Sequence, residues 1–197
     1  EYIYNRALFA QYQWSGDRMD LLLGARGDDH SGFGRHNTGN ITLGGKVGNG
    51  RLYLSHGSAF KAPTFLQRFY PNYGDPALEP EKSVTTELGY RLGSLQASLF
   101  DTRIENLIEF TFPDGYSNVS RARIKGAELE YGKKINHWQL NGGLTLQKTE
   151  DEETGEQLLR RAEKKLFFTA NGSVAEDTDI GVEVVYTGPR MDRGGVE

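Results

Sequence analysis

The sequence of 197 residues contains no cysteine, which excludes disulfide frameworks, thiolate catalysis and cysteine-ligated metal sites. It also lacks any apolar run near the ~18 residues that a membrane-spanning helix needs. With a formal net charge of −4, it has no overall positive field, so we expect no nucleic-acid partner. Its four histidines are scattered without zinc-binding spacing, and we expect no metal site.

The sequence does contain 25 glycines, 10 tyrosines and 10 phenylalanines, although hydrophobic residues make up only 37% of it. This combination fits two classes of protein. One is a soluble all-β protein. The other is an outer-membrane β-barrel, whose strands face lipid with only every second residue.

Apolar and polar residues alternate along most of the chain, and a period of two is the signature of β-strands. Between 138 and 146, for example, Trp138, Leu140, Leu144 and Leu146 share the face that we expect to point outward. Most of the segments reach the ~9–11 residues that cross a bilayer as a tilted strand. We predict about ten strands in an all-β, antiparallel up-and-down meander, at residues 2–14, 19–29, 38–47, 51–60, 83–92, 94–105, 117–133, 137–149, 164–174 and 179–188.

The connections between these strands alternate between short and long. The tight ones are "SGDR", "GNG", a step at Gly93, "KINH" and "AEDT". The long ones are "HSGFGRHN", the loop 61–82, the stretch around "FPDGYSN", and "EDEETGEQLLRRA". In an up-and-down sheet all short turns then lie at one end and all long loops at the other. Transmembrane barrels have this asymmetry, whereas β-sandwiches mix their loop lengths.

Two further sets of residues favour the barrel over a dry β-core. Aromatic residues near strand ends would form girdles at the membrane interfaces: Tyr2, Tyr4, Tyr12, Trp14, Tyr53, Tyr90, Tyr131, Trp138 and Tyr186. Alternatively, they fill a β-core, since aromatic residues favour strands in general. The inward positions carry polar residues that suit a water-lined or plugged interior: Lys46, Glu87, Arg91, Glu128, Glu130 and Gln139.

The segment from Ser58 to Gly89 resembles a motif of the TonB-dependent outer-membrane receptors. The motif comprises "SAFKAP" at the end of a strand, "GDPALEPEKS" in the following loop and "ELG" in the next strand. "DDHSGFGRHNTGN", "RARIKGAELE" and "QLLRRAEKK" are similar, in the same order, to parts of the cobalamin receptors within that family.

The resemblance implies that residues 1–197 are part of a C-terminal transmembrane barrel of about 22 strands. The plug domain, the energy-coupling box and the final strand of that family are not recognisable in them. It also implies a location in the bacterial outer membrane, in contact with its lipid, and active uptake of cobalamin. Energy would come from the TonB protein through the plug domain. The alternatives are a siderophore or haem receptor of the same family, a soluble β-rich binding module, or a passive porin.

The candidate site residues lie in two of the long loops. The resemblance assigns a ligand contact to the first arginine of "LLRR", which is Arg160. Alternatively, Arg160 pairs with one of the acidic residues of its own loop, Glu152, Glu153 or Glu156. We expect Arg160 to lie within reach of the loop 61–82. There, Phe65, Phe69, Tyr70 and Tyr73 either offer flat surfaces to a large amphipathic ligand or pack the loop against its neighbours. No catalytic residues or cofactor are expected, and we interpret the chain as non-enzymatic.

Overall fold

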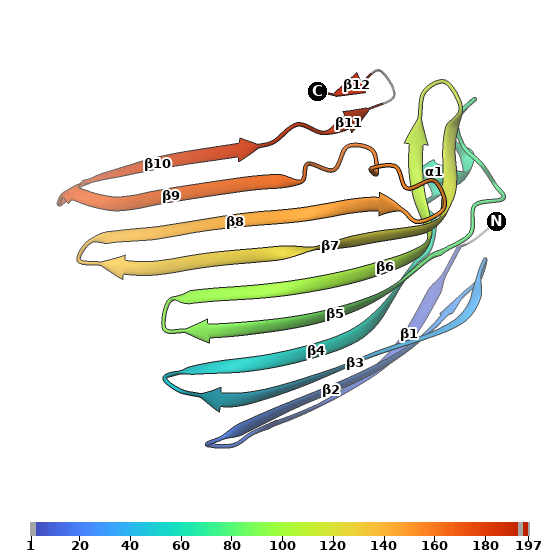
Figure 1. The fold of residues 1–197 in the computed structure, drawn as a ribbon. Helices are drawn as coiled ribbons and strands as arrows, with labels where there is room; N and C mark the ends of the chain where they lie inside the picture. Colours follow the sequence, from blue (N-terminus) through green and yellow to red (C-terminus); the bar gives the residue numbers. More distant parts are fainter. Residues whose placement is uncertain (1–2, 193–194, 197) are drawn as a thin grey trace.

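The structure, a computed structural model, describes residues 3–192 and 195–196. Ten strands form one sheet in which each strand pairs with the next along the chain (Figure 1). The elements are β1 (Asn5–Ser15), β2 (Met19–His30), β3 (Gly34–Val47), β4 (Gly50–Lys61), α1 (Phe65–Phe69), β5 (Glu81–Leu92), β6 (Leu95–Thr111), β7 (Gly115–Ile135), β8 (Trp138–Asp151), β9 (Lys164–Ala175), β10 (Thr178–Thr187), β11 (Met191–Asp192) and β12 (Gly195–Val196). The all-β, antiparallel up-and-down meander of ten strands is confirmed.

The register of the sheet separates an apolar face from a polar one. One row across β4–β8 consists of Leu54, Leu88, Leu99, Ala127 and Leu146. The four residues predicted to point outward from β8 lie on this same apolar face. Its large side chains are well exposed, with Leu99 at 59%. A sheet face this apolar and this exposed is typical of a barrel wall that faces lipid.

The opposite face carries the polar residues expected in a barrel interior. Lys46, Arg91 and Glu130 fall in one row across β3–β7. The other three predicted interior residues lie on the same face, two or four positions along their strands. A hydrogen bond of 2.6 Å from the Tyr53 hydroxyl to Glu87 also lies on this face.

The hydrogen bond to Glu87 shows that the prediction was wrong for Tyr53, which does not belong to an aromatic girdle. Tyr53 belongs to the polar face because its neighbours Leu52 and Leu54 occupy the apolar one. The polar face satisfies its hydroxyl through Glu87, whereas the lipid-facing side offers no such partner. Tyr2 lies outside the described residues. Six others lie on the apolar face, namely Tyr12, Trp14, Tyr90, Tyr131, Trp138 and Tyr186, and Tyr4 precedes β1.

The five connections predicted to be tight lie at one end of the sheet and the four predicted to be long lie at the other (Figure 1). Two of the predicted long loops are nevertheless short. β2 ends at His30 and β3 begins at Gly34, while β6 ends at Thr111 and β7 begins at Gly115. Each glycine has a positive φ, +75° and +91°, which lets three residues close the hairpin. The flanking polar residues therefore continue the strand ladders, where their backbone groups are paired.

The loop between β4 and β5 contains the short helix α1. Thr64 caps it: its side chain accepts a hydrogen bond from the Gln67 backbone, and the Gln67 side chain accepts one from the Thr64 backbone. This reciprocal pair satisfies two amide groups at the helix start. Among residues 3–192 and 195–196, no helix has the length and apolarity to cross a membrane.

The hairpin of β6 and β7 is longer than a membrane crossing requires. Its strands contain 17 and 21 residues, against the ~9–11 that span a bilayer. At its upper end lies a small core of Leu107, Ala122 and Leu158, flanked by three partly buried apolar residues. The hairpin therefore extends as a folded unit beyond the part of the wall that crosses the membrane. This extension of β6 and β7 is called the post.

Candidate functional site

The loop 62–80 is fastened to the β6–β7 hairpin by hydrogen bonds. The Tyr116 amide donates to the Tyr73 carbonyl at 2.8 Å. The Asn118 side chain donates to the Glu79 carbonyl at 3.1 Å and accepts from the Glu79 amide at 2.9 Å. Asn106 donates to the Glu79 carboxylate at 2.7 Å. These bonds fix the second half of the loop against the hairpin.

An aromatic cluster forms where this loop meets the hairpin. The Tyr73 ring lies 5.9 Å from Phe110, 6.0 Å from Phe112 and 5.9 Å from Tyr70, measured between centroids. Phe110 also contacts Tyr116 at 5.0 Å. Centroid distances in this range are those of favourable aromatic pairs. Tyr73 therefore packs the loop, whereas Tyr70 keeps 45% of its surface exposed.

The two phenylalanines of α1 are exposed and pair with each other. Phe65 is 68% exposed and Phe69 43%, and their rings lie 4.8 Å apart. Arg68 lies between two aromatic rings, with its guanidinium 5.0 Å from Phe69 and 5.2 Å from Phe33. Helix α1 thus presents one cationic and two aromatic side chains at the end of the sheet that carries the long loops.

The second candidate loop, residues 152–163, folds over the interior side of the β6–β7 hairpin. Leu158 is its buried anchor, at 2% exposure in the small core. The core residues Ala122 and Ile124 share a strand face with Glu128, which is an interior position. The loop therefore covers the edge of the barrel mouth.

Arg160 lies in this loop with a positive φ of +57°. Its Nε and Nη2 donate to the two carboxylate oxygens of Asp192 at 3.2 and 3.4 Å. Its guanidinium stands 5.9 Å from the centre of the Phe110 ring. The predicted pairing within its own loop is wrong, because Asp192 is its ion-pair partner and Glu153 faces Arg121 at 3.9 Å. Asp192 lies beyond β10, so the local sequence pattern gives no signal of it.

The neighbouring Arg161 has a different environment. Its guanidinium donates to Glu109 at 2.5 Å, and the two side chains are only 28% and 10% exposed. Arg160 is more open, at 46%. Arg161 is thus half-buried in its pair with Glu109, whereas Arg160 is the more exposed of the two arginines and pairs with Asp192.

The two predicted groups meet through a residue that sequence analysis missed. Phe110 contacts Arg160 on one side and Tyr73 on the other. A hollow of about 310 Å³ beside it is lined by Ile108, Glu109, Phe110, Leu159, Arg160 and Arg161. Phe110 ends the apolar–polar alternation of β6, and nothing in its own segment marks it as a site residue. Phe65 and Phe69 belong to α1, where their rings pair with each other.

No group of three His, Cys, Asp or Glu side chains within 3–192 and 195–196 is arranged to hold a metal ion. The site instead combines an exposed guanidinium, several aromatic faces and a shallow hollow. This arrangement can bind a large ligand by stacking and hydrogen bonding.

The fold defines a wall segment of a transmembrane barrel, with its long loops together at one end. The family model for the TonB dependent receptor-like β-barrel matches residues 2–190. The chain belongs to this family, and its location is the outer membrane.

Among curated proteins, the vitamin B12 transporter BtuB of Vibrio vulnificus (strain YJ016) is 29% identical over 97% of this chain and 33% of its own length. The BtuB of Vibrio cholerae serotype O1 (strain ATCC 39541) is 33% identical over 95% of this chain and 32% of its own. The chain thus spans about a third of the length of these relatives.

Solved structures with the same fold include the copper transporter OprC, with a TM-score of 0.73 and 19% identity. It is matched over 95% of this chain and 34% of its own. The siderophore receptor PirA of Pseudomonas aeruginosa gives 0.71 and 23%, over 94% and 38%. At such low identities the likeness concerns the fold.

Proposed function

We propose that the receptor containing this segment takes up cobalamin actively across the outer membrane. The observation that carries the proposal is the match to vitamin B12 transporters along 95–97% of the chain, which includes both candidate loops. Residues 1–197 then form part of the barrel domain of a longer protein. Elsewhere in that protein, a plug domain engages TonB.

The geometry of the outer loops supports this ligand. Cobalamin is a large molecule with a flat ring, many amide groups and one phosphate. The exposed guanidinium of Arg160 can donate two parallel hydrogen bonds to such acceptors. The rings of Tyr70, Phe65 and Phe69 offer flat apolar surfaces of matching size.

The proposed role is transport without chemical conversion. The curated relatives are transporters. The proposal is supported by the exposed Arg160 and Tyr70, which are suited to bind a ligand by hydrogen bonding and stacking. Arg160 is held next to Phe110 by Asp192 in the structure, and we infer that it turns to the ligand when cobalamin binds.

The test uses the full-length receptor, expressed in a Gram-negative strain that lacks its own cobalamin receptor. Uptake of radiolabelled cobalamin should saturate, should disappear in a strain without TonB, and should be competed by unlabelled cobalamin. A ferric siderophore or haem that competes better than cobalamin would reassign the ligand. Undiminished uptake without TonB would instead make the protein a passive pore.

A further inference from the structure

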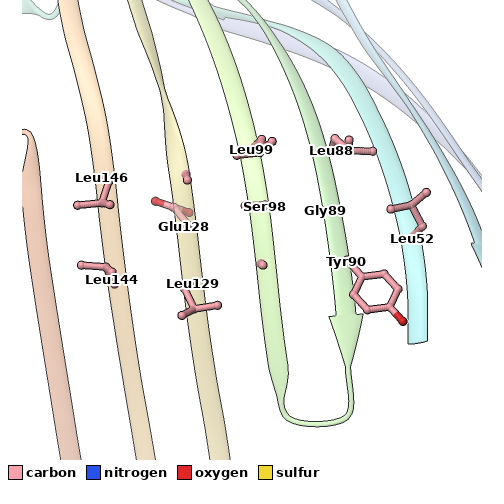
Figure 2. A pocket seen from close by; sticks show the side chains of 12 residues that line it. Leu52, Leu88, Gly89, Tyr90, Ser98, Leu99, Glu128, Leu129, Leu144 and Leu146 are labelled. Carbon is pink, nitrogen blue, oxygen red and sulfur yellow. The ribbon is translucent and has the colours of Figure 1, made fainter. Parts of the chain in front are cut away.

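A trough crosses the apolar face of the sheet over β4–β8. It encloses about 410 Å³, and leucines from several strands stand around it (Figure 2). They are Leu52, Leu88, Leu99, Leu129, Leu144 and Leu146. The space arises at Ala97 and Ala127, whose methyl side chains leave gaps between Tyr90 and Leu129 and between Leu99 and Leu146.

This trough continues into a second hollow of about 510 Å³. The two share Leu88 and Leu99. The second hollow runs toward the loop end, past Thr86, to Asp101 and Arg103. Together they form one amphipathic groove on the lipid-facing wall, apolar at one end and charged at the other.

The charged end carries more positive than negative side chains. Asp101, Lys125 and Lys148 lie in one row across β6–β8, and Arg103, Arg123 and Glu150 lie in the next. Arg123 binds Asp101 through both guanidinium branches, at 2.9 and 2.5 Å. Lys148 pairs with Glu150.

Two cations remain after this pairing. Within the part of the chain that the structure describes, neither Arg103 nor Lys125 has a carboxylate at ion-pair distance, and both side chains are exposed. They flank the Asp101–Arg123 pair on adjacent strands. An anionic group bound at this end of the groove therefore meets two exposed cations that are not engaged in the two salt bridges.

We propose that this groove binds one lipid with a net negative phosphate headgroup, with an acyl chain in the trough and the phosphate at Arg103 and Lys125. Cations on a lipid-facing wall are tolerated at headgroup level and not in the hydrocarbon. At that level they attract anionic lipid. A second copy of the chain fits less well, because a two-fold contact would oppose the same positive patches.

The test uses the full-length receptor in neutral detergent, and native mass spectrometry counts the lipids it retains. Dioleoyl phosphatidylglycerol is compared with dioleoyl phosphatidylcholine, which has the same chains and no net charge. We expect one phosphatidylglycerol to be retained in clear preference. Replacing both cations, Arg103→Gln with Lys125→Gln, should weaken its retention roughly 25-fold, at about fivefold for each charge.

Two further variants distinguish lipid binding in the groove from non-specific electrostatic attraction of lipid to the receptor. Lys133 lies on β7, on the same face as Lys125 but at the opposite end of the apolar band, and is also exposed. Lys133→Gln should leave retention unchanged. Ala97→Leu with Ala127→Leu fills the trough, and should weaken both lipids while keeping the headgroup preference.

The proposal is overturned if the Arg103/Lys125 double variant retains phosphatidylglycerol like the parent, or if Lys133→Gln loses as much. Equal retention of the two lipids, or a receptor dimer in place of a lipid adduct, also contradicts it. Heat-modifiable gel migration verifies folding. If the double variant does not fold, the single variant Lys125→Gln decides, with an expected loss of about fivefold.

Discussion

Replacing Arg160 with alanine tests the ligand site most directly. In the structure its guanidinium is 46% exposed and bound to Asp192 at 3.2 and 3.4 Å. An exposed ion pair contributes only ~0–1 kcal/mol, so the cation can turn to a ligand at little cost. One charge-assisted hydrogen bond to the ligand contributes ~1.5–3 kcal/mol. Arg160→Ala should therefore weaken cobalamin binding by roughly ten- to hundredfold.

The assay is equilibrium binding of cobalamin to the full-length receptor, with barrel insertion followed separately by gel migration. Asp192→Ala is the informative partner variant, because it frees the guanidinium. Its affinity should equal that of the parent or exceed it by up to about fivefold, the equivalent of ~1 kcal/mol. Glu153→Ala is the matched control and should have no effect, since Glu153 faces Arg121 at 3.9 Å and both are more than half exposed.

A different pattern of results would refute this reasoning. If Arg160→Ala binds cobalamin as tightly as the parent, Arg160 is a structural residue and its assignment from the family is wrong. If Asp192→Ala weakens binding as much as Arg160→Ala does, the ion pair itself shapes the loop. Arg160→Lys distinguishes charge from geometry, because a lysine keeps the charge but cannot donate two parallel hydrogen bonds.

Three other substitutions test the fold around the site. Tyr53→Phe removes the hydroxyl that donates to Glu87 at 2.6 Å and should lower the free energy of unfolding by about 1 kcal/mol, measured by urea titration of the receptor in detergent; no change would mean that the bond contributes nothing net. Leu158→Ala removes the buried anchor of residues 152–163 and should weaken their attachment by ~2–5 kcal/mol, seen as faster hydrogen exchange in that loop alone. Protection that is unchanged there would contradict the assigned core. Thr64→Ala removes the cap of α1 and should cost about 1 kcal/mol of helix stability, so amide exchange should quicken in the helix and stay constant in the sheet.

The strands of the barrel wall could be predicted from sequence because the information for them is local. A residue in an antiparallel wall faces lipid or the interior according to its position in the alternation, and β8 and β10 begin and end within two residues of their predicted bounds. The extension of β6 and β7 was missed because the sequence pattern that marks a strand is lost there. Above the membrane both faces of a hairpin meet water or loops, so the alternation fades although the ladder continues.

The candidate site was predictable only in part. Motif similarity located Arg160 and the aromatic loop, but the link between them is Phe110, which belongs to neither. The partner of Arg160 lies 32 residues further along the chain. Contacts of this kind depend on which loops the sheet brings together, and a pattern read within one segment does not contain that information.

The post formed by β6 and β7 has a mechanical consequence. Tyr116 and Asn118 tie the loop 62–80 to the post, and Leu158 ties the loop 152–163 to the same post. Both loops are therefore attached to the same hairpin, and a displacement of the hairpin would move the two attachment points together. An antibody that binds the tip of the post should therefore restrict both loops without entering the binding site.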